Sequence, residues 1–127
     1  MGAYWITRWF FTHRIHAIRP IVRVIFWVMI NINFAHPIDR LVETDTLVAF
    51  HHPKPTYPVH ILLVPKRTIE DLEGISQQDA AFLLDVFQVV RILVARFGLG
   101  ENGYRLIMNG GKFQLFPYLH FHLISGE

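Results

Sequence analysis

Apolar residues recur at three- and four-residue intervals in the second half of the chain, which is the spacing of one face of an α-helix. Ser76 followed by Asp79 has the pattern of a capping box, and Gly98 after Arg96 is typical of a helix end. We therefore predict a helix from Ser76 to Gly98. Its apolar stripe should face the core and consists of Phe82, Leu83, Val86, Phe87, Val90, Leu93, Val94 and Phe97.

Short runs of β-branched and aromatic residues, separated by turn-forming residues, predict strands on both sides of this helix. The predicted strands are Thr46–Phe50, Val59–Val64, Tyr104–Met108 and Leu119–Ile124. The acidic stretch Thr68–Gly74 should form one or two helical turns. These elements together predict a compact α+β domain over residues 37–127.

The first 36 residues have a different pattern. At about 100° per residue, one face of a helix there collects polar side chains, and the rest is aromatic and aliphatic. The polar face consists of Arg8, Thr12, His16, Arg19 and Arg23. Pro20 removes one helix hydrogen bond and predicts a kink. We predict that residues 1–36 form a basic and aromatic amphipathic helical extension of the domain.

The role of this extension stays open between two main alternatives. The uninterrupted apolar run Val24–Ile30 is far shorter than the roughly 18 to 20 residues of a membrane span. Arginines inside the apolar stretch also argue against a secretory signal. Residues 4–32 could pack on the domain or a partner subunit, or lie on a membrane surface or membrane complex. We accordingly expect a cytoplasmic protein, with peripheral attachment to a membrane as the alternative.

Composition narrows the candidate chemistry. The 127 residues include no cysteine, so disulfides and thiolate zinc sites are excluded. The formal net charge is only +2, and four arginines in the extension are the main argument for nucleic acid. Without a recognisable groove-reading motif we do not expect a nucleic-acid partner.

The last predicted strand places two histidines on one face. Side chains alternate along a strand, so Leu119, Phe121 and Leu123 should enter the core. The opposite face then carries Tyr118, His120, His122 and Ile124. Imidazoles two residues apart lie about 7 Å from each other, which is the span of a phosphate group.

One of these two histidines could attack a phosphorus atom while the other donates a hydrogen bond to a phosphate oxygen, because a neutral imidazole is a good nucleophile near pH 7. A zinc site is the alternative, with His51, His52 or His60 as a third ligand. No acidic residue lies close in sequence to support it, so we expect neither metal nor another cofactor.

Several motifs resemble the histidine triad (HIT) family in the family's order. Tyr118–Ile124 is similar to the signature His-x-His-x-His-x-x, in which x is apolar, and Gln114 stands six residues before His120. Tyr104–Gly110 resembles the family's strand that ends in asparagine and glycine. Asp45–Phe50 and Pro58–Lys66 resemble its two early strands. The resemblance runs from about Ile38 to Gly126.

This resemblance implies a HIT-like α+β fold, with about five antiparallel strands, one long helix and pairing into a homodimer. It also implies hydrolysis or transfer at the α-phosphate of a purine nucleotide or another nucleoside phosphate derivative. His120 would be the nucleophile that takes up the nucleotidyl group, and His122 would hold the phosphate. Asn109 and Gln114 would bind phosphate or the leaving group. His60 and the loop after Phe50 would border the nucleoside pocket.

The chain departs from the family pattern at three of these positions. Tyr118 replaces the first histidine, although its hydroxyl can still form a hydrogen bond. His52 stands where many members carry an aspartate for the ribose, and Leu115 replaces a small hydroxyl residue. Lys112 could compensate as a phosphate-binding charge.

Two hypotheses about function remain. We favour a nucleotidyl hydrolase or transferase that works through a nucleotidyl-histidine intermediate. The alternative is a catalytically degenerate HIT domain that serves as a binding or structural subunit, attached to a membrane or membrane complex by its N-terminal helix.

Overall fold

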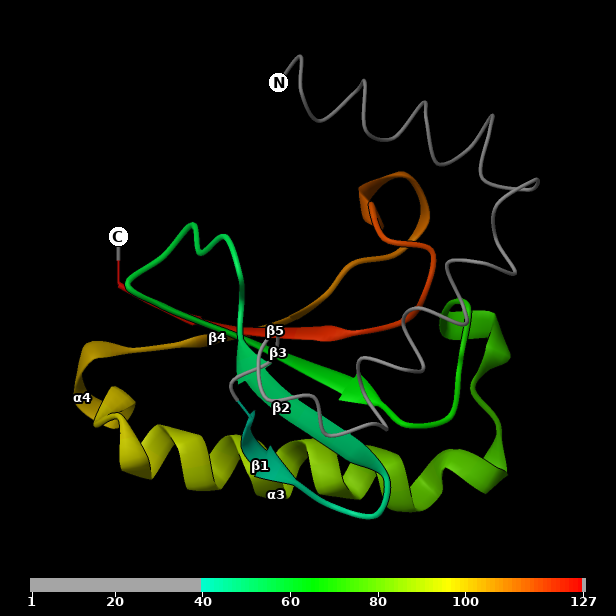
Figure 1. Cartoon of the computed structure of the whole chain (residues 1–127), viewed down its shortest axis with the longest axis horizontal. Coiled ribbons are helices and arrows are strands. Elements are labelled where there is room, and N and C mark those ends of the chain that lie inside the picture. Colours follow the sequence, from blue (N-terminus) through cyan, green and yellow to red (C-terminus); the bar gives the residue numbers. More distant parts are fainter. Residues whose placement is uncertain (1–39, 127) are drawn as a thin grey trace.

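The computed structural model describes residues 40–126, and within that range it forms one five-stranded antiparallel sheet with helices on one side (Figure 1). The sheet order is β1-β2-β3-β5-β4. The strands are β1 (Arg40–Glu43), β2 (Leu47–His51), β3 (Val59–Pro65), β4 (Arg105–Met108) and β5 (Phe121–Ser125). The helices are α3 (Ala80–Arg96) and α4 (Leu99–Asn102), with 3₁₀ turns η1 (Leu72–Gly74), η2 (Gln77–Asp79) and η3 (Gly111–Phe113).

The predicted α+β fold, with an antiparallel sheet and one long helix, is confirmed. The predicted helical extension over residues 1–36, and its proposed membrane or packing roles, lie outside the described residues. None of the helices within residues 40–126 combines the length and the hydropathy that a membrane span requires.

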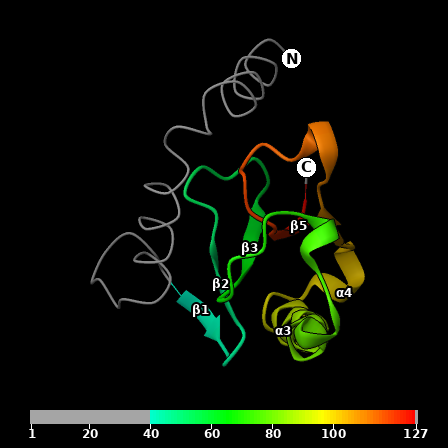
Figure 2. The ribbon, with the colours of Figure 1, turned by 90° about the vertical axis from the view of Figure 1, so that its right-hand side faces the viewer.

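Helix α3 covers one face of the sheet, and Figure 2 views it nearly end-on beneath the strands. The predicted capping box is present, because the backbone N–H of Ser76 donates to the carboxylate of Asp79 at 3.0 Å. The first turn, however, is the 3₁₀ turn η2, so the α-helix starts at Ala80 rather than Ser76. The helix ends as predicted, since Gly98 adopts a left-handed φ of 64° that favours glycine.

One residue of the predicted apolar stripe is misplaced. Phe87 leaves 60% of its surface exposed, whereas its neighbour Val86 is fully buried. Each residue turns the helix by about 100°, so the position after Val86 points away from the sheet. Val89, which the stripe omitted, takes its place in the core.

One element is absent from the sequence prediction. The edge strand β1 is missed, because its charged ends Arg40 and Glu43 hide a four-residue pattern. The stretch Thr68–Gly74 contains one helical turn, as predicted, and this turn is the 3₁₀ turn η1 at the end of the stretch.

The two faces of the sheet bury different side chains. Leu47, Ala49, Ile61, Leu63 and Leu123 pack toward α3 in the main core. The alternating positions face the opposite side, where Val48, Phe50 and Val64 form a second apolar cluster with Leu62. His60 and His122 share this second face, which therefore carries the candidate chemistry.

An ion pair fixes the start of α3 to the segment that follows β3. Arg67 donates two hydrogen bonds to the carboxylate of Asp79, at 2.8 and 2.7 Å, and Asp79 is only 3% exposed. Two residues after Arg67, the carbonyl of Ile69 accepts a 2.7 Å hydrogen bond from the N–H of Leu119. The ion pair thus steadies the backbone that holds the residues just before β5.

Candidate active site

Four imidazoles form a row on the sheet face opposite α3. Their order is His52, His60, His122 and His120, and successive ring centroids lie 4.4, 5.2 and 4.8 Å apart. His60 comes from β3, His122 from β5, and the other two lie just outside β2 and β5. The structure therefore brings together His120, His122, His60 and His52, all predicted as site residues.

A backbone contact sets the orientation of His120. Its Nδ1 lies 2.7 Å from the carbonyl oxygen of Tyr118, which can only accept, so Nδ1 carries the hydrogen. In the neutral ring, Nε2 then holds the free lone pair. This is the tautomer that a nucleophilic histidine needs.

The peptide group that orients His120 is itself held at both ends. Its carbonyl belongs to Tyr118, and its N–H belongs to Leu119 and donates to the carbonyl of Ile69 at 2.7 Å. Because a peptide group is planar, these two bonds fix its orientation. The first position of the motif thus serves His120 through its backbone, which a tyrosine provides as well as a histidine.

A second chain of hydrogen bonds sets the tautomer of His122. The N–H of Thr56 donates to Nδ1 of His60 at 3.1 Å, so the hydrogen of His60 resides on Nε2. That Nε2 lies 2.9 Å from Nδ1 of His122 and donates to it. His122 consequently carries its own hydrogen on Nε2, which is buried and has no hydrogen-bond partner among the described residues.

Burial keeps this row of imidazoles neutral. Desolvation, together with the neighbouring imidazoles of His120, His60 and His52, lowers the pKa of His122 to about 3. Desolvation also lowers the pKa of His120, although its bond to the Tyr118 carbonyl acts in the opposite direction. The pKa values of His60 and His52 are lowered by burial too. At pH 7 the row therefore offers a lone pair on His120 and, on His122, a buried N–H donor without a partner among the described residues.

The rings of His120 and His122 are closer than the sequence spacing predicts. Their centroids lie 4.8 Å apart rather than about 7 Å, because side chains lean toward each other above the strand. The gap between the two rings is therefore narrower than the phosphate-sized spacing that the sequence predicts.

Comparison with known proteins matches this arrangement of elements. A family model described as the HIT domain matches residues 33–127. An uncharacterized HIT-like protein from Helicobacter pylori is 34% identical over 94 residues, which cover 72% of this chain and 86% of that protein. The chain belongs to the HIT domain family.

Solved structures of HIT proteins share the fold. A HIT family hydrolase from Clostridium thermocellum is similar with a TM-score of 0.71 and 30% identity, over 81% of this chain and 90% of that one. A histidine triad nucleotide-binding protein from Candida albicans is similar with a TM-score of 0.67 and 29% identity, over 81% of this chain and 75% of that one.

His52 and Phe50 border the site at the end of β2. The N–H of Lys54 donates to Nδ1 of His52 at 2.9 Å, so the neutral His52 ring keeps an N–H donor on Nε2. A donor stands here in place of the acceptor carboxylate of many HIT proteins. Phe50 is buried in the neighbouring apolar cluster.

The segment between β4 and β5 (orange in Figure 1) lies across the sheet from α3 and carries the other predicted binding residues. Gln114 uses its amide nitrogen on the backbone carbonyls of Glu70 and Phe116, at 2.7 and 3.1 Å. The Nζ atom of Lys112 lies 5.8 Å from the ring centroid of Phe113. Ligand-binding roles for Gln114 and Lys112 stay predictions.

Asn109 follows β4, one residue beyond the pair that Met108 forms with Phe121. The register therefore brings Asn109 to the level of His120, the residue before Phe121. It is half-buried at this place. A role for Asn109 in phosphate binding stays a prediction.

Sequence reasoning missed two contributors to the site. Thr56 and Ile69 act through backbone groups, which no residue-type pattern reveals. The ring of Phe116, which the sequence places beside the motif, lies 6.1 Å from the ring of His120 between centroids, in an edge-on contact. No group of three or more metal-ligating side chains between residues 40 and 126 has the geometry to hold a metal ion.

Proposed function

We propose that this HIT protein is a nucleotidyl hydrolase or transferase that acts at the α-phosphate of a nucleoside phosphate derivative. The observation that carries the proposal is the opposite tautomers of two adjacent histidines. His120 presents a lone pair on Nε2, and His122 presents a buried N–H donor with no described partner. A buried donor without a partner is costly, and a phosphate oxygen would satisfy it.

The reaction proceeds in two displacements. In the first, Nε2 of His120 forms a bond to the α-phosphorus, and the bond from phosphorus to the leaving group breaks. The leaving group keeps the electron pair and takes a proton from solvent. In the second, water or another acceptor attacks the same phosphorus, the bond to His120 breaks, and the acceptor loses a proton.

The other groups of the row support these steps without changing covalently. The N–H of His122 binds a non-bridging oxygen as negative charge builds up on it. His60 keeps that hydrogen on the outer nitrogen of His122 through its own 2.9 Å bond. Because the low pKa values keep the row uncharged at pH 7, His120 attacks without first losing a proton.

The hydrolase named in the structural comparison and the nucleotide-binding protein named beside it support this substrate class. The alternative, a HIT domain that binds nucleotides without turning them over, predicts the same ligand but no product. Only a measurement of turnover therefore distinguishes the enzyme from the nucleotide-binding domain.

The test is incubation of the full chain with adenosine 5′-phosphoramidate and with dinucleoside polyphosphates. We expect turnover by the wild type and a loss of at least about a thousandfold in His120→Ala, since no other group replaces a covalent nucleophile. His51→Ala is the matched control, because His51 is exposed at the end of β2 and packs near Phe97. Equal turnover by wild type and His120→Ala, or none by the wild type, would contradict the proposal.

A further inference from the structure

His52 stands at the end of the histidine row opposite His120. Its ring centroid lies 4.4 Å from that of His60 and 6.2 Å from that of His122, and its plane is inclined by 22° to the plane of the His122 ring. The side chain is half-buried. The row therefore continues from the two histidines of the motif to an imidazole that takes no part in the displacement steps.

Two hydrogen bonds to backbone groups hold His52 in place. Its own N–H donates to the carbonyl of His60 at 2.8 Å, and the N–H of Lys54 donates to its ring Nδ1 at 2.9 Å. Burial lowers the pKa of His52 and favours the neutral ring, whose hydrogen is then on Nε2. No residue between 40 and 126 forms a hydrogen bond with that Nε2. His52 thus presents one N–H donor in a held orientation.

The opposite end of the row is occupied by aromatic side chains. Phe116 contacts His120 edge-on, with 6.1 Å between ring centroids, and lies 5.7 Å from the ring of Tyr118, which is buried. A nucleotide whose α-phosphate lies at His120 and His122 is therefore directed along the row. Its sugar is joined to that phosphate through one oxygen and one carbon, so the sugar hydroxyls come within reach of His52.

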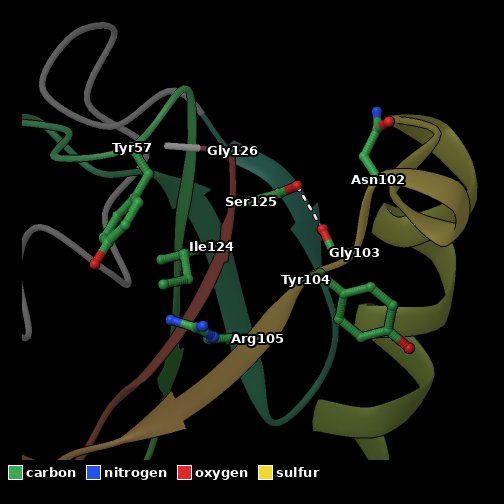
Figure 3. Close-up of a pocket in the computed structure, with 8 residues that line it drawn as sticks. All are labelled: Tyr57, Asn102, Gly103, Tyr104, Arg105, Ile124, Ser125 and Gly126. Carbon is green, nitrogen blue, oxygen red and sulfur yellow. Dashed lines mark hydrogen bonds between the residues drawn. The ribbon is translucent and has the colours of Figure 1, made fainter.

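The neighbours of His52 leave it as the donor that a sugar can use. Both ring nitrogens of His60 are already bonded, one to the N–H of Thr56 and one to His122. Tyr57 contacts the ring of His60 edge-on and also lines a cavity of about 440 Å³ beside β4 (Figure 3). No histidine lines that cavity. Of the two imidazoles beyond the motif, His52 alone keeps an N–H for a ligand.

We propose that this site binds ribonucleotides and 2′-deoxyribonucleotides alike, because His52 offers the sugar a single hydrogen-bond donor. The inference rests on the proposed function for the position of the α-phosphate. A ring with its hydrogen on Nε2 donates one bond to one sugar oxygen and accepts no hydrogen from the two neighbouring hydroxyl groups. A carboxylate at the same place would accept both hydrogens and select the 2′,3′-diol. The 3′ oxygen is common to both sugars, so loss of the 2′-hydroxyl leaves the bond to His52 intact.

Equilibrium binding to the full chain tests this inference without turnover. Titration calorimetry compares AMP, 2′-deoxy-AMP and 2′,3′-dideoxy-AMP, which carry no leaving group. The wild type should bind the first two with dissociation constants within about twofold of each other. It should bind the dideoxy analogue about fivefold more weakly, because that ligand lacks the oxygen that accepts from His52.

Two substitutions separate the donor of His52 from the bulk of its ring. His52→Phe keeps a planar ring without the N–H, and it should bind all three ligands within about twofold of one another. His52→Asp supplies a carboxylate and should prefer AMP over 2′-deoxy-AMP by at least about fivefold. The added negative charge weakens binding of both ligands, so the ratio of the two dissociation constants is the readout.

His51→Phe is the matched control and should keep the wild-type ratios, since His51 is exposed and points to the other face of the sheet. A wild-type preference of more than about twofold for AMP over 2′-deoxy-AMP would overturn the inference. So would an unchanged loss for the dideoxy analogue in His52→Phe. If the ligands bind with the expected ratios but the chain turns over no substrate, only the proposed catalysis fails. If substrate is turned over but the ratios differ, only the inference about the sugar fails.

Discussion

The peptide group between Tyr118 and Leu119 forms hydrogen bonds at both of its ends, to Nδ1 of His120 and to the carbonyl of Ile69. Its carbonyl would accept the same bond if residue 118 were histidine. The Tyr118 side chain is itself buried, with 1% of its surface exposed. The substitution that makes the motif look incomplete therefore changes packing more than it changes the orientation of the nucleophile.

We predict that Tyr118→His leaves kcat within about threefold of the wild type, because the backbone bond to His120 is kept. The same variant should lower the free energy of unfolding by about 1 to 3 kcal/mol, since a smaller polar ring replaces a buried aromatic one. Steady-state kinetics and urea denaturation measure the two effects. A rise of tenfold or more in kcat would instead show that the missing histidine side chain limits the reaction.

His60 acts through His122. Replacing His60 by leucine removes the donor that fixes the tautomer of His122, and we expect kcat to fall about tenfold, the equivalent of one hydrogen bond. His60→Gln keeps an N–H donor at a similar reach and should recover part of the loss. If the leucine and glutamine variants are equally slow, packing rather than the hydrogen bond explains the effect.

At the scale of elements, the loop before β5 depends on the segment between β3 and α3. Arg67 and Asp79 join the two ends of that segment, and the carbonyls of Ile69 and Glu70 between them hold Leu119 and Gln114. The pKa of Asp79 is lowered chiefly by its hydrogen bonds from Arg67, which shows that the carboxylate is stabilised in its charged form.

We predict that Asp79→Asn lowers the free energy of unfolding by about 2 kcal/mol, because it breaks a largely buried ion pair and a helix cap. This expected loss of unfolding free energy is smaller than the loss for a fully buried ion pair, because the side chain of Arg67 remains 43% exposed and can be hydrated. The midpoint of urea denaturation measures the change. Asp45→Asn, at an exposed position, is the control and should stay within about 0.5 kcal/mol of the wild type.

The sequence predicts the elements of this domain better than it predicts their contacts. Val59–Val64 and the end of α3 at Gly98 follow from strand composition and from glycine's access to a left-handed φ. The edge strand β1 does not follow from its sequence, because its few residues gain their structure only by pairing with β2. The spacing of His120 and His122 indicates a shared face. Their tautomers depend on backbone groups from distant segments and could not be read from residue types.

At the scale of the whole molecule, the neutral histidine row links stability to pH. Its pKa values in the folded chain are lowered, so the unfolded chain binds more protons below about pH 6.5. The contribution of these histidines to stability is therefore fully present above about pH 6.5. This contribution is lost as the pH falls from about 6.5 toward the folded pKa of His122, which is about 3.

We predict that the free energy of unfolding falls between pH 6.5 and 5.0, where most carboxylates keep their charge. Each histidine that stays neutral in the folded chain contributes up to about 1.4 kcal/mol per pH unit. Urea denaturation at several pH values measures the slope. His122→Asn should reduce the slope, and an unchanged slope in that variant would mean that His122 does not titrate differently on unfolding.

Other features of the whole molecule stay predictions. A homodimer is consistent with the position of β4 as an end strand of the sheet formed by residues 40–126, and with the exposed apolar side chains of Leu84 and Phe87 on the outer side of α3. Attachment to a membrane concerns residues 4–32, which lie outside the described part of the chain.

In the proposed reaction, His120 carries the nucleotidyl group between the two displacements. This intermediate can be trapped by alkaline quenching during the first turnover of adenosine 5′-phosphoramidate and detected by mass spectrometry of the intact chain and its peptides. We expect one adenylyl group per chain, located on His120 and absent from His120→Ala. Product formed in the first turnover without any adduct, or an adduct on His122 or another residue, would contradict it.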